Sequence, residues 1–346
     1  MKLLILTQKV DKKDPILGFF HDWIAELSKK FSEVSVICLE KGEFDLPQNV
    51  RVYSLGKESG GSKIKYVRNF MNLILGLHKQ YDSVFIHMNQ EYVLLGGFFW
   101  KIMGKKIFFW RNHPKGNFLT RIAVLLSDKV FYTSKYSYTA KFKKAVIMPV
   151  GIDTERFKDG KKERLKNSIL FLSRMSPIKK PDLLIEALGI LNKENTDFVC
   201  DFYGDPLPKD QDYYDLLKNK VREFRLENKV NFYKGVPNRE TPGIYAKHSI
   251  FVNLTPAGSF DKTIFEAGAC GCLLVVANQS LVGAIDERMI LKKQKPEDVV
   301  DCISFWLGVS KTEKESASTK LQEYILKTHS LDLLVNKLAG VITAQF

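Results

Sequence analysis

Short apolar runs with the spacing of β-strands alternate with amphipathic helical segments along almost the whole chain. Near the start, Lys2–Thr7 and Val34–Leu39 are strand-like, and Gly18–Phe31 between them has helical spacing. Because a strand, a helix and a strand in this order form a βαβ unit, we expect parallel sheets. Strands are predicted at residues 2–7, 34–39, 50–55, 83–87, 106–110, 129–133, 145–149, 168–173, 197–203, 229–233, 250–254 and 273–277.

The alternation is interrupted once, which predicts a domain boundary. Pro149–Phe157 is followed by a charge-rich segment, and the strand–helix pattern then starts again. The chain has 346 residues, 45% of them hydrophobic, which is enough for two cores. We therefore predict two doubly wound, Rossmann-like α/β domains at residues 1–150 and 151–329, facing a central cleft. Ligands of such sheets bind at the carboxyl ends of the strands.

The cysteines and the apolar runs predict a cytoplasmic protein. The five cysteines are scattered and show neither a disulfide framework nor zinc-ligand spacing. The apolar run after Met1 is too short for a signal peptide. No run approaches the roughly 18 apolar residues that span a bilayer.

Positive charge is concentrated in one part of the first domain. Of the net charge of +14, residues 62–144 carry +12, from 15 lysines and arginines against three acidic residues. Such a field favours nucleic acid, anionic lipid or a polyanionic substrate. Lys63–Gln80 has a basic amphipathic pattern, and Gly97–Arg111 combines aromatic residues with cations. These segments either lie on an anionic bilayer or pack their apolar faces on the sheet with their lysines in water.

The stretch Asn253–Asn278 is the strongest candidate for a ligand site. It reads as a strand end, a loop of small residues, a helix from about Asp261 to Cys270, a turn and a strand. The start of this helix would present free N–H groups to an anion in the loop. Glu266 lies inside the helix. Its purely structural interpretation is a capping box that it forms with Thr263.

Three motifs resemble the retaining glycosyltransferases of family 4, also called glycosyl transferases group 1. Leu172-Ser-Arg174-Met-Ser-Pro-Ile-Lys179 resembles the family's strand followed by an arginine and, five residues later, a lysine. Phe265-Glu266-Ala-Gly-Ala-Cys-Gly271 resembles its glutamate helix, and Pro149–Phe157 resembles its linker. The resemblance implies the two-domain GT-B architecture, with the last helix, about residues 330–346, packing back on the first domain.

The resemblance also implies roles for individual residues. Arg174 and Lys179 would stabilise the diphosphate that leaves when the sugar of a nucleotide-sugar donor is transferred. Glu266 would accept hydrogen bonds from the ribose hydroxyls, and the segment around Val236 would pass the base. The family usually has a second glutamate eight residues before Glu266, which holds the sugar, but this chain has Gly258 there. Asp261 or Ser259 would take over that contact, with N–H groups from Phe260, Lys262 and Thr263.

In the first domain the resemblance is looser. Gly18 stands where a glycine loop lies beside the diphosphate, although one glycine replaces the usual two. His113, after the strand that ends at Trp110, resembles a histidine near the transferred sugar and is the candidate catalytic residue. Its alternative is a loop histidine bonded to the backbone. His87, at another strand end, is the second candidate.

The resemblance implies a reaction without metal or other cofactor, because cationic side chains and a helix terminus stabilise the leaving group. Asp210-Gln-Asp212 resembles the metal-binding motif of a different glycosyltransferase architecture, but acidic residues are expected at a helix start. The chain has no evident nucleophile, so the resemblance implies attack by the acceptor on the face from which the nucleotide leaves. The predicted acceptor is a glycan or a lipid-linked precursor, with the enzyme peripheral on the inner face of a membrane.

Two other functions are consistent with the residues. One is a non-catalytic membrane or nucleic-acid binder on a degenerate GT-B scaffold, supported by charge alone because no nucleic-acid-binding motif is visible. The other is a different GT-B enzyme, such as an epimerase or a phosphorylase, since a fold does not determine the reaction.

Overall fold

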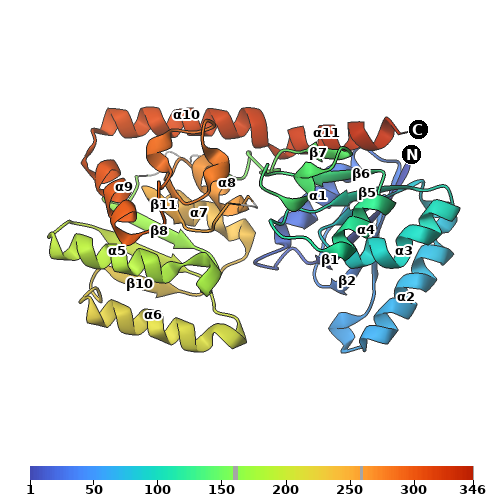
Figure 1. The fold of residues 1–346 in the computed structure, drawn as a ribbon, viewed down its shortest axis with the longest axis horizontal. Helices are drawn as coiled ribbons and strands as arrows, with labels where there is room; N and C mark the ends of the chain where they lie inside the picture. Colours follow the sequence, from blue (N-terminus) through green and yellow to red (C-terminus); the bar gives the residue numbers. More distant parts are fainter. Residues whose placement is uncertain (159–162, 258–259, 346) are drawn as a thin grey trace. The chain divides into compact units, whose positions relative to one another are not determined.

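The computed structural model describes residues 1–158, 163–257 and 260–345 (Figure 1). The chain divides into two compact units, each built around a parallel sheet with helices on both faces. The first unit comprises Met1–Gly151, Pro237–Arg239 and Leu331–Phe346, and the second comprises Ile152–Val236 and Glu240–Ser330. The predicted class, two doubly wound α/β domains, is confirmed.

The sheet of the first unit has seven parallel strands in the order β3-β2-β1-β4-β5-β6-β7. Because the strand order runs outward in both directions from β1 and β4, the carboxyl ends of these two strands flank the switch point of the sheet. The strands are β1 (Lys2–Val10), β2 (Glu33–Lys41), β3 (Val50–Ser54), β4 (Ser83–His87), β5 (Lys106–Trp110), β6 (Lys129–Tyr132) and β7 (Ala145–Ile147).

Two apolar clusters cover the two faces of this sheet. On one face, α1 (Gly18–Ser28) and the last helix, α11 (Leu331–Thr343), bury Phe20, Trp23 and Leu334 against the strands. On the other face, α2 (Lys63–Gly76), α3 (Gln90–Ile102) and α4 (Phe118–Leu126) bury a second cluster. Residues from the far end of the chain therefore complete the core of the first unit.

The sheet of the second unit has five parallel strands in the order β10-β9-β8-β11-β12. The strands are β8 (Ser168–Leu172), β9 (Val199–Tyr203), β10 (Val230–Tyr233), β11 (Ile250–Asn253) and β12 (Leu273–Val276). The helices are α5 (Pro181–Lys193), α6 (Gln211–Glu223), α7 (Thr241–Tyr245), α8 (Lys262–Ala269), α9 (Pro296–Gly308) and α10 (Lys311–His329).

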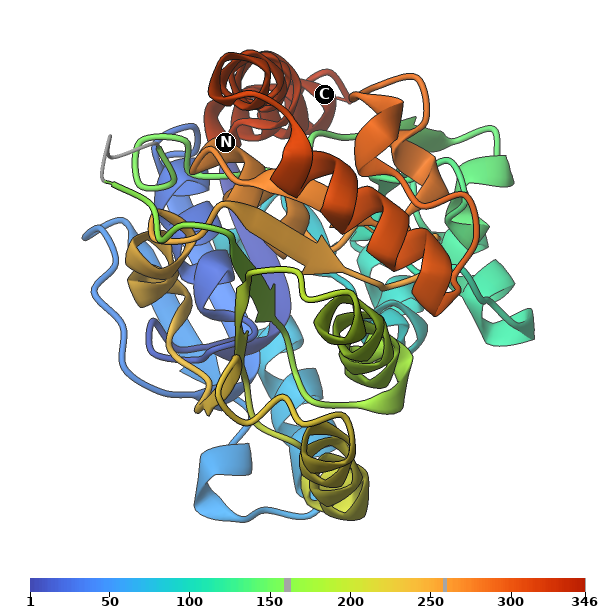
Figure 2. The same cartoon turned by 90° about the vertical axis from the view of Figure 1, so that its left-hand side faces the viewer.

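The helices of the second unit form a layer on each face of its sheet. Helix α5 lies beside both α6 and α9, and Figure 2 shows these three helices turned toward the viewer. Helix α8 packs against α10, where a side chain at Gly268 would collide with Ile325. The small residues of the predicted glutamate helix thus permit a close helix–helix contact.

All twelve predicted strands are present, and their ends differ by a few residues. The largest difference is β1, which we predicted to end at Thr7 but which continues to Val10. Pairing with β2 continues through Lys9 and Glu40, whose side chains also form an ion pair of 2.9 Å. The polar residues Gln8 and Lys9 broke the apolar pattern, which is why the sequence did not reveal this extension.

All five cysteines are buried, and none forms a disulfide. Cys38 lies in β2 of the first unit, and the other four lie in the second unit. Among the described residues, no helix is both long and apolar enough to cross a membrane.

Candidate active site

The strand order of the second unit brings two predicted site segments together. Strands β8 and β11 are neighbours at the centre of the sheet, where the strand order reverses. Arg174 follows the carboxyl end of β8, and Asp261 begins the helix that follows β11. Because parallel strands end at the same edge, both segments lie at the switch point at which open α/β sheets bind ligands.

The two cations of the loop after β8, Arg174 and Lys179, differ in their exposure and in their partners. Met175 is fully buried, and its N–H donates to the Asp205 carbonyl at 3.2 Å, which anchors the loop. The turn Pro177–Lys179 then directs the Lys179 side chain inward, and Pro181 starts α5. Arg174 is exposed, and no ion pair or hydrogen bond engages its guanidinium within the ranges that the structure describes.

Asp261 is the centre of a polar network. Its Oδ2 forms an ion pair with Lys179 and accepts hydrogen bonds from Asn253 Nδ2 at 3.1 Å and Thr255 Oγ1 at 3.3 Å. Its Oδ1 accepts from Thr263 Oγ1 at 3.1 Å. Lys179 Nζ also donates to Thr255 Oγ1 at 3.2 Å. The network therefore joins the ends of β8 and β11 to the start of α8.

The Asp261 carboxylate is ionised at any ordinary pH. Burial alone would raise its pKa, but the Lys179 ammonium, together with hydrogen bonds from Lys179, Asn253 and Thr263, lowers the pKa to about 2. The site therefore keeps a fixed negative charge beside one of its two predicted phosphate-binding cations.

Glu266 lies in the second turn of α8 and is 2% exposed. Its Oε2 accepts a hydrogen bond of 3.3 Å from the hydroxyl of Tyr245, a fully buried residue in α7. The capping-box alternative for Glu266 is wrong, because the N-cap is Asp261, which places Glu266 beyond the third helical position. Helix α8 ends at Ala269, one residue before the predicted end, and Gly271, whose φ of +84° is left-handed, follows the C-cap Cys270.

An aromatic cluster supports the loop that leads into α8. The Phe260 ring contacts Phe265 with centroids 5.0 Å apart, and the His329 ring lies 4.5 Å from Phe265 and 6.0 Å from Phe260. Tyr324 Oη lies 2.9 Å from His329 Nε2. Burial lowers the pKa of His329 to about 4, so the imidazole is neutral at pH 7.

The structure also shows where most of the other residues lie that were predicted to bind the nucleotide-sugar donor. Lys262 and Thr263 form the first turn of α8, and Val236 follows β10 and is half-buried. Next to Val236, the Gly235 N–H donates to the Asp205 carboxylate at 3.0 Å. Ser259, and the position of Gly258, lie outside the described residues. Asn253, Thr255 and Tyr245 were not predicted, although polar residues closing an otherwise apolar strand were a visible signal for the first two.

The candidates of the first unit lie at the carboxyl ends of its strands. Gly18 is the buried first residue of α1. His113 is exposed after β5, and its Nδ1 lies 2.9 Å from the Lys115 carbonyl and 3.0 Å from the Lys115 N–H. This is the backbone contact of the alternative interpretation. His87 is buried and stacks on Phe20 with centroids 3.9 Å apart.

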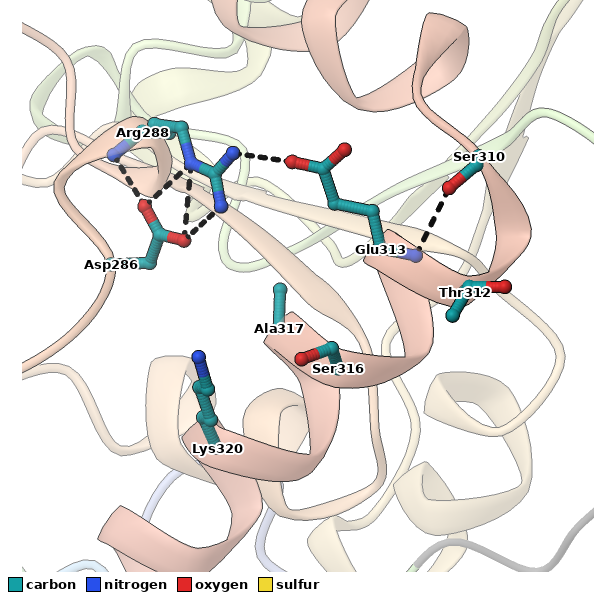
Figure 3. Close-up of a pocket in the computed structure, with 8 residues that line it drawn as sticks. All are labelled: Asp286, Arg288, Ser310, Thr312, Glu313, Ser316, Ala317 and Lys320. Atoms are coloured by element: carbon teal, nitrogen blue, oxygen red, sulfur yellow. Dashed lines mark hydrogen bonds and ion pairs between the residues drawn. The ribbon is translucent and has the colours of Figure 1, made fainter.

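A pocket of about 410 Å³ elsewhere in the second unit is not part of this site (Figure 3). It lies between the turn Glu287–Met289 and the start of α10. Its Arg288 guanidinium is occupied by Asp286, at 2.6 Å, and Glu313, at 2.5 Å. In the described ranges, no group of three or more His, Cys, Asp or Glu side chains is arranged to hold a metal ion.

The fold and this edge of the sheet define a GT-B protein. The structure of HepE from Anabaena, in complex with UDP and glucose, superposes on 99% of this chain and 100% of its own with a TM-score of 0.79 at 18% sequence identity. Residues 152–315 match the model of the family described as glycosyl transferases group 1. This part of the chain is therefore similar to the group 1 glycosyltransferases, as its sequence motifs predicted.

Two curated relatives, both named as D-inositol 3-phosphate glycosyltransferases, match at the sequence level. The protein of Frankia alni is 26% identical over 153 residues, which cover 40% of this chain and 38% of the relative. The protein of Catenulispora acidiphila is 27% identical over 140 residues, which cover 37% of this chain and 33% of the relative. The matched segments thus span well under half of either relative.

Proposed function

We propose that this protein is a retaining glycosyltransferase that transfers a sugar from a nucleotide-diphosphate sugar to an acceptor. The observation that carries the proposal is the grouping of Arg174, Lys179 and the N-terminus of α8 at the carboxyl ends of β8 and β11, with Glu266 buried in the same helix. HepE has been solved with UDP and glucose and with UDP-glucose, which supports a donor of this class.

Each residue has a chemical role in this proposal. When the sugar leaves, negative charge grows on the diphosphate, and the forked donors of Arg174 and the ammonium of Lys179 stabilise it. The N–H groups at the start of α8 add a positive electrostatic potential. The Glu266 carboxylate accepts hydrogen bonds from the two ribose hydroxyls and so orients the nucleoside.

The transfer retains the configuration at the anomeric carbon. The bond from this carbon to the phosphate oxygen breaks as the acceptor oxygen bonds to the same face, and the departing phosphate takes the acceptor's proton. Retaining glycosidases instead use a carboxylate nucleophile. Both carboxylates of this site in the described residues have other partners, Lys179 for Asp261 and Tyr245 for Glu266. Proton NMR of the first product tests the proposal, and an inverted anomeric configuration would refute it.

Donor binding is tested by thermal stabilisation with a panel of nucleoside diphosphates and nucleotide sugars. A ligand at a hundred times its dissociation constant adds about 2.7 kcal/mol of stability. We expect one nucleotide to stabilise the protein, and Arg174→Ala and Glu266→Ala to remove the shift. Lys193→Ala, which removes an exposed cation at the far end of α5, is the control. If no nucleotide stabilises the wild-type protein, the proposed function is wrong.

Catalysis is proposed to need no metal, because the two cations and the helix terminus neutralise the leaving group. Activity should therefore survive EDTA. Gly18, beside the diphosphate, and His113, near the transferred sugar, stay predictions. His113→Ala is expected to lower kcat with little effect on donor affinity. An unchanged kcat would show that His113 has no part in catalysis and only makes its backbone contact to Lys115.

The acceptor is proposed to be a lipid-linked or cell-surface glycan precursor, with the enzyme bound to the anionic inner face of a membrane. The support is an apolar surface on α3 and α4, two helices that pack side by side. On α3, the exposed residues Leu95, Phe98 and Ile102 recur at helical spacing, which places them on one side. On α4, Phe118 and Leu125 are 73% and 74% exposed.

This surface belongs to the basic part of the chain, and positive charge favours contact with an anionic bilayer. The α3–α4 surface lies within residues 62–144, which carry +12 of the protein's +14. The predicted amphipathic segment of α2 contributes less, because Phe70, Ile74 and Leu77 pack into the core. Of its large apolar residues, Ile64, Val67 and Leu75 are exposed. Of the two segments singled out in the sequence, the aromatic one is therefore the better membrane contact.

A further inference from the structure

The ion pair between Lys179 and Asp261 creates a conflict within the proposed donor site. The side chains of both residues are 17% exposed, so the pair is largely shielded from solvent. Lys179 has three N–H donors, of which one is directed to Asp261 and one to Thr255. A phosphate oxygen that binds Lys179 must therefore either replace Asp261 or lie close to its negative charge.

The formal charges of the site show the size of the conflict. Arg174 and Lys179 carry two formal positive charges, and the paired Asp261 carboxylate cancels one of them. A nucleoside diphosphate brings two or more negative charges, so the pair leaves fewer positive charges on these side chains than the ligand requires. While it is paired with Lys179, the Asp261 carboxylate has a pKa lowered to about 2 and is ionised.

The Asp261 carboxylate is held by more than Lys179. Asn253 Nδ2 donates to Oδ2, and Thr263 Oγ1 donates to Oδ1. Asn253 is the buried last residue of β11, and it also bonds Thr263 Oγ1 at 3.2 Å. If Lys179 turns to a phosphate, the carboxylate can keep its position and its donors Asn253, Thr255 and Thr263 but loses its counter-ion. Hydroxyl groups of a bound ligand can then donate to it.

We propose that Asp261 is an exchangeable counter-ion that couples diphosphate binding to sugar recognition. Without donor, Asp261 neutralises Lys179. When a nucleotide sugar binds, the diphosphate takes Lys179, and the freed carboxylate accepts hydrogen bonds from hydroxyl groups of the sugar to be transferred. This inference rests on the proposed function. It follows that the nucleoside diphosphate product, which has no sugar, leaves Asp261 uncompensated beside a phosphate and is released.

The test is calorimetric titration of one nucleoside diphosphate and its nucleotide sugar, chosen from the panel above, into the wild-type protein and Asp261→Asn. The asparagine has nearly the same shape but no charge. We expect Asp261→Asn to bind the nucleoside diphosphate at least about tenfold more tightly, because a close like charge is gone. Its affinity for the nucleotide sugar should rise less or fall. Asp212→Asn, at an exposed position at the start of α6, is the control and should change neither affinity.

The outcomes separate this inference from the function on which it rests. If the wild-type protein binds neither ligand, both are overturned. If it binds both, and Asp261→Asn leaves the two affinities unchanged or weakens them equally, Asp261 is a static support and this inference alone fails.

A crystal structure of the wild-type protein with the nucleotide sugar tests the exchange without a variant. We expect Lys179 Nζ to contact a phosphate oxygen and an Asp261 oxygen to contact a sugar hydroxyl. An intact Lys179–Asp261 pair with the diphosphate bound elsewhere would overturn the exchange.

Discussion

The hydroxyl of Tyr245 lies 3.3 Å from a carboxylate oxygen of Glu266 and donates a hydrogen bond to it from a neighbouring helix. Both side chains are buried, and burial together with the charge of Glu266 raises the pKa of Tyr245 well above its usual value. The phenol therefore remains a donor at every accessible pH. It thereby helps to orient the Glu266 carboxylate in the site.

This contact predicts a specific effect of Tyr245→Phe on the donor site. The ring stays and packs against Phe251, but the hydrogen bond is lost, at a cost of about 1 kcal/mol. If Glu266 binds ribose, nucleotide affinity measured by calorimetry should fall about fivefold. The matched control is Tyr214→Phe, which removes a phenol from α6 of the same unit. An unchanged affinity would show that Tyr245 does not orient Glu266 for the ligand.

The backbone conformation at Gly204 predicts that adding a single methyl group there, by substitution with alanine, strongly destabilises the protein. Its φ of +144° is unfavourable for other residues, and an added Cβ would lie 1.9 Å from the Ser173 carbonyl oxygen, beside Arg174. Gly204→Ala should therefore reduce the free energy of unfolding by about 2 kcal/mol or more and lower nucleotide affinity. Gly243→Ala, where the new methyl group meets nothing within 4 Å, is the control. Equal melting temperatures would contradict the expected collision.

His329 predicts a pH dependence of the stability of the second unit. Its pKa is about 4 when folded, against an unfolded value of about 6.5. The unfolded state therefore binds more protons between these values. The stabilisation is complete above pH 6.5 and is lost as the pH falls toward 4, by up to about 3 kcal/mol.

Urea unfolding at pH 7.5 and pH 5 measures this dependence. His329→Gln should flatten it, whereas His78→Gln, at an exposed histidine of the first unit, should not. If His329→Gln keeps the full slope, another group is responsible.

The α3–α4 surface predicts a membrane-binding defect without a folding defect. Phe98 and Ile102 are 65% and 69% exposed, so replacing both with serine removes little core packing. The double variant should co-sediment less with liposomes of anionic lipid at low salt and keep its melting temperature. Leu216→Ser, at an exposed leucine of α6, is the comparison. Wild-type protein that stays in the supernatant, or a double variant that binds as well as wild type, would refute this surface.

The sequence predicted the sheets well because their strands are short apolar runs with clear boundaries. β4 and β5 have the predicted ends, and β1 was cut short because its last residues are polar. The sequence could also place Arg174, Lys179 and Asp261 near one another, since parallel strands end at one edge. It could not show that Lys179 and Asp261 pair, because the lysine precedes the aspartate by 82 residues and only the strand order joins them.

Other features could not be predicted from the sequence, because they depend on packing between segments that are far apart in the chain. The capping box at Glu266 fitted the local spacing, but the helix begins at Lys262, and the Glu266 partner comes from α7. His329 gave no signal, because its neighbours Phe260 and Phe265 are about 65 residues away in the sequence.

Because the five thiols are buried, the opening of each unit can be followed separately by thiol labelling. Burial raises the pKa of Cys38 to about 12 and that of Cys200 well above its usual value, so neither is a reactive thiolate in the folded protein. A thiol-labelling reagent can modify Cys38 only after the first unit opens, and the other four only after the second unit opens. Mass spectrometry of partly unfolded protein therefore distinguishes a gain of one label from a gain of four. The order in which the two units lose their structure can be measured without introducing a single probe.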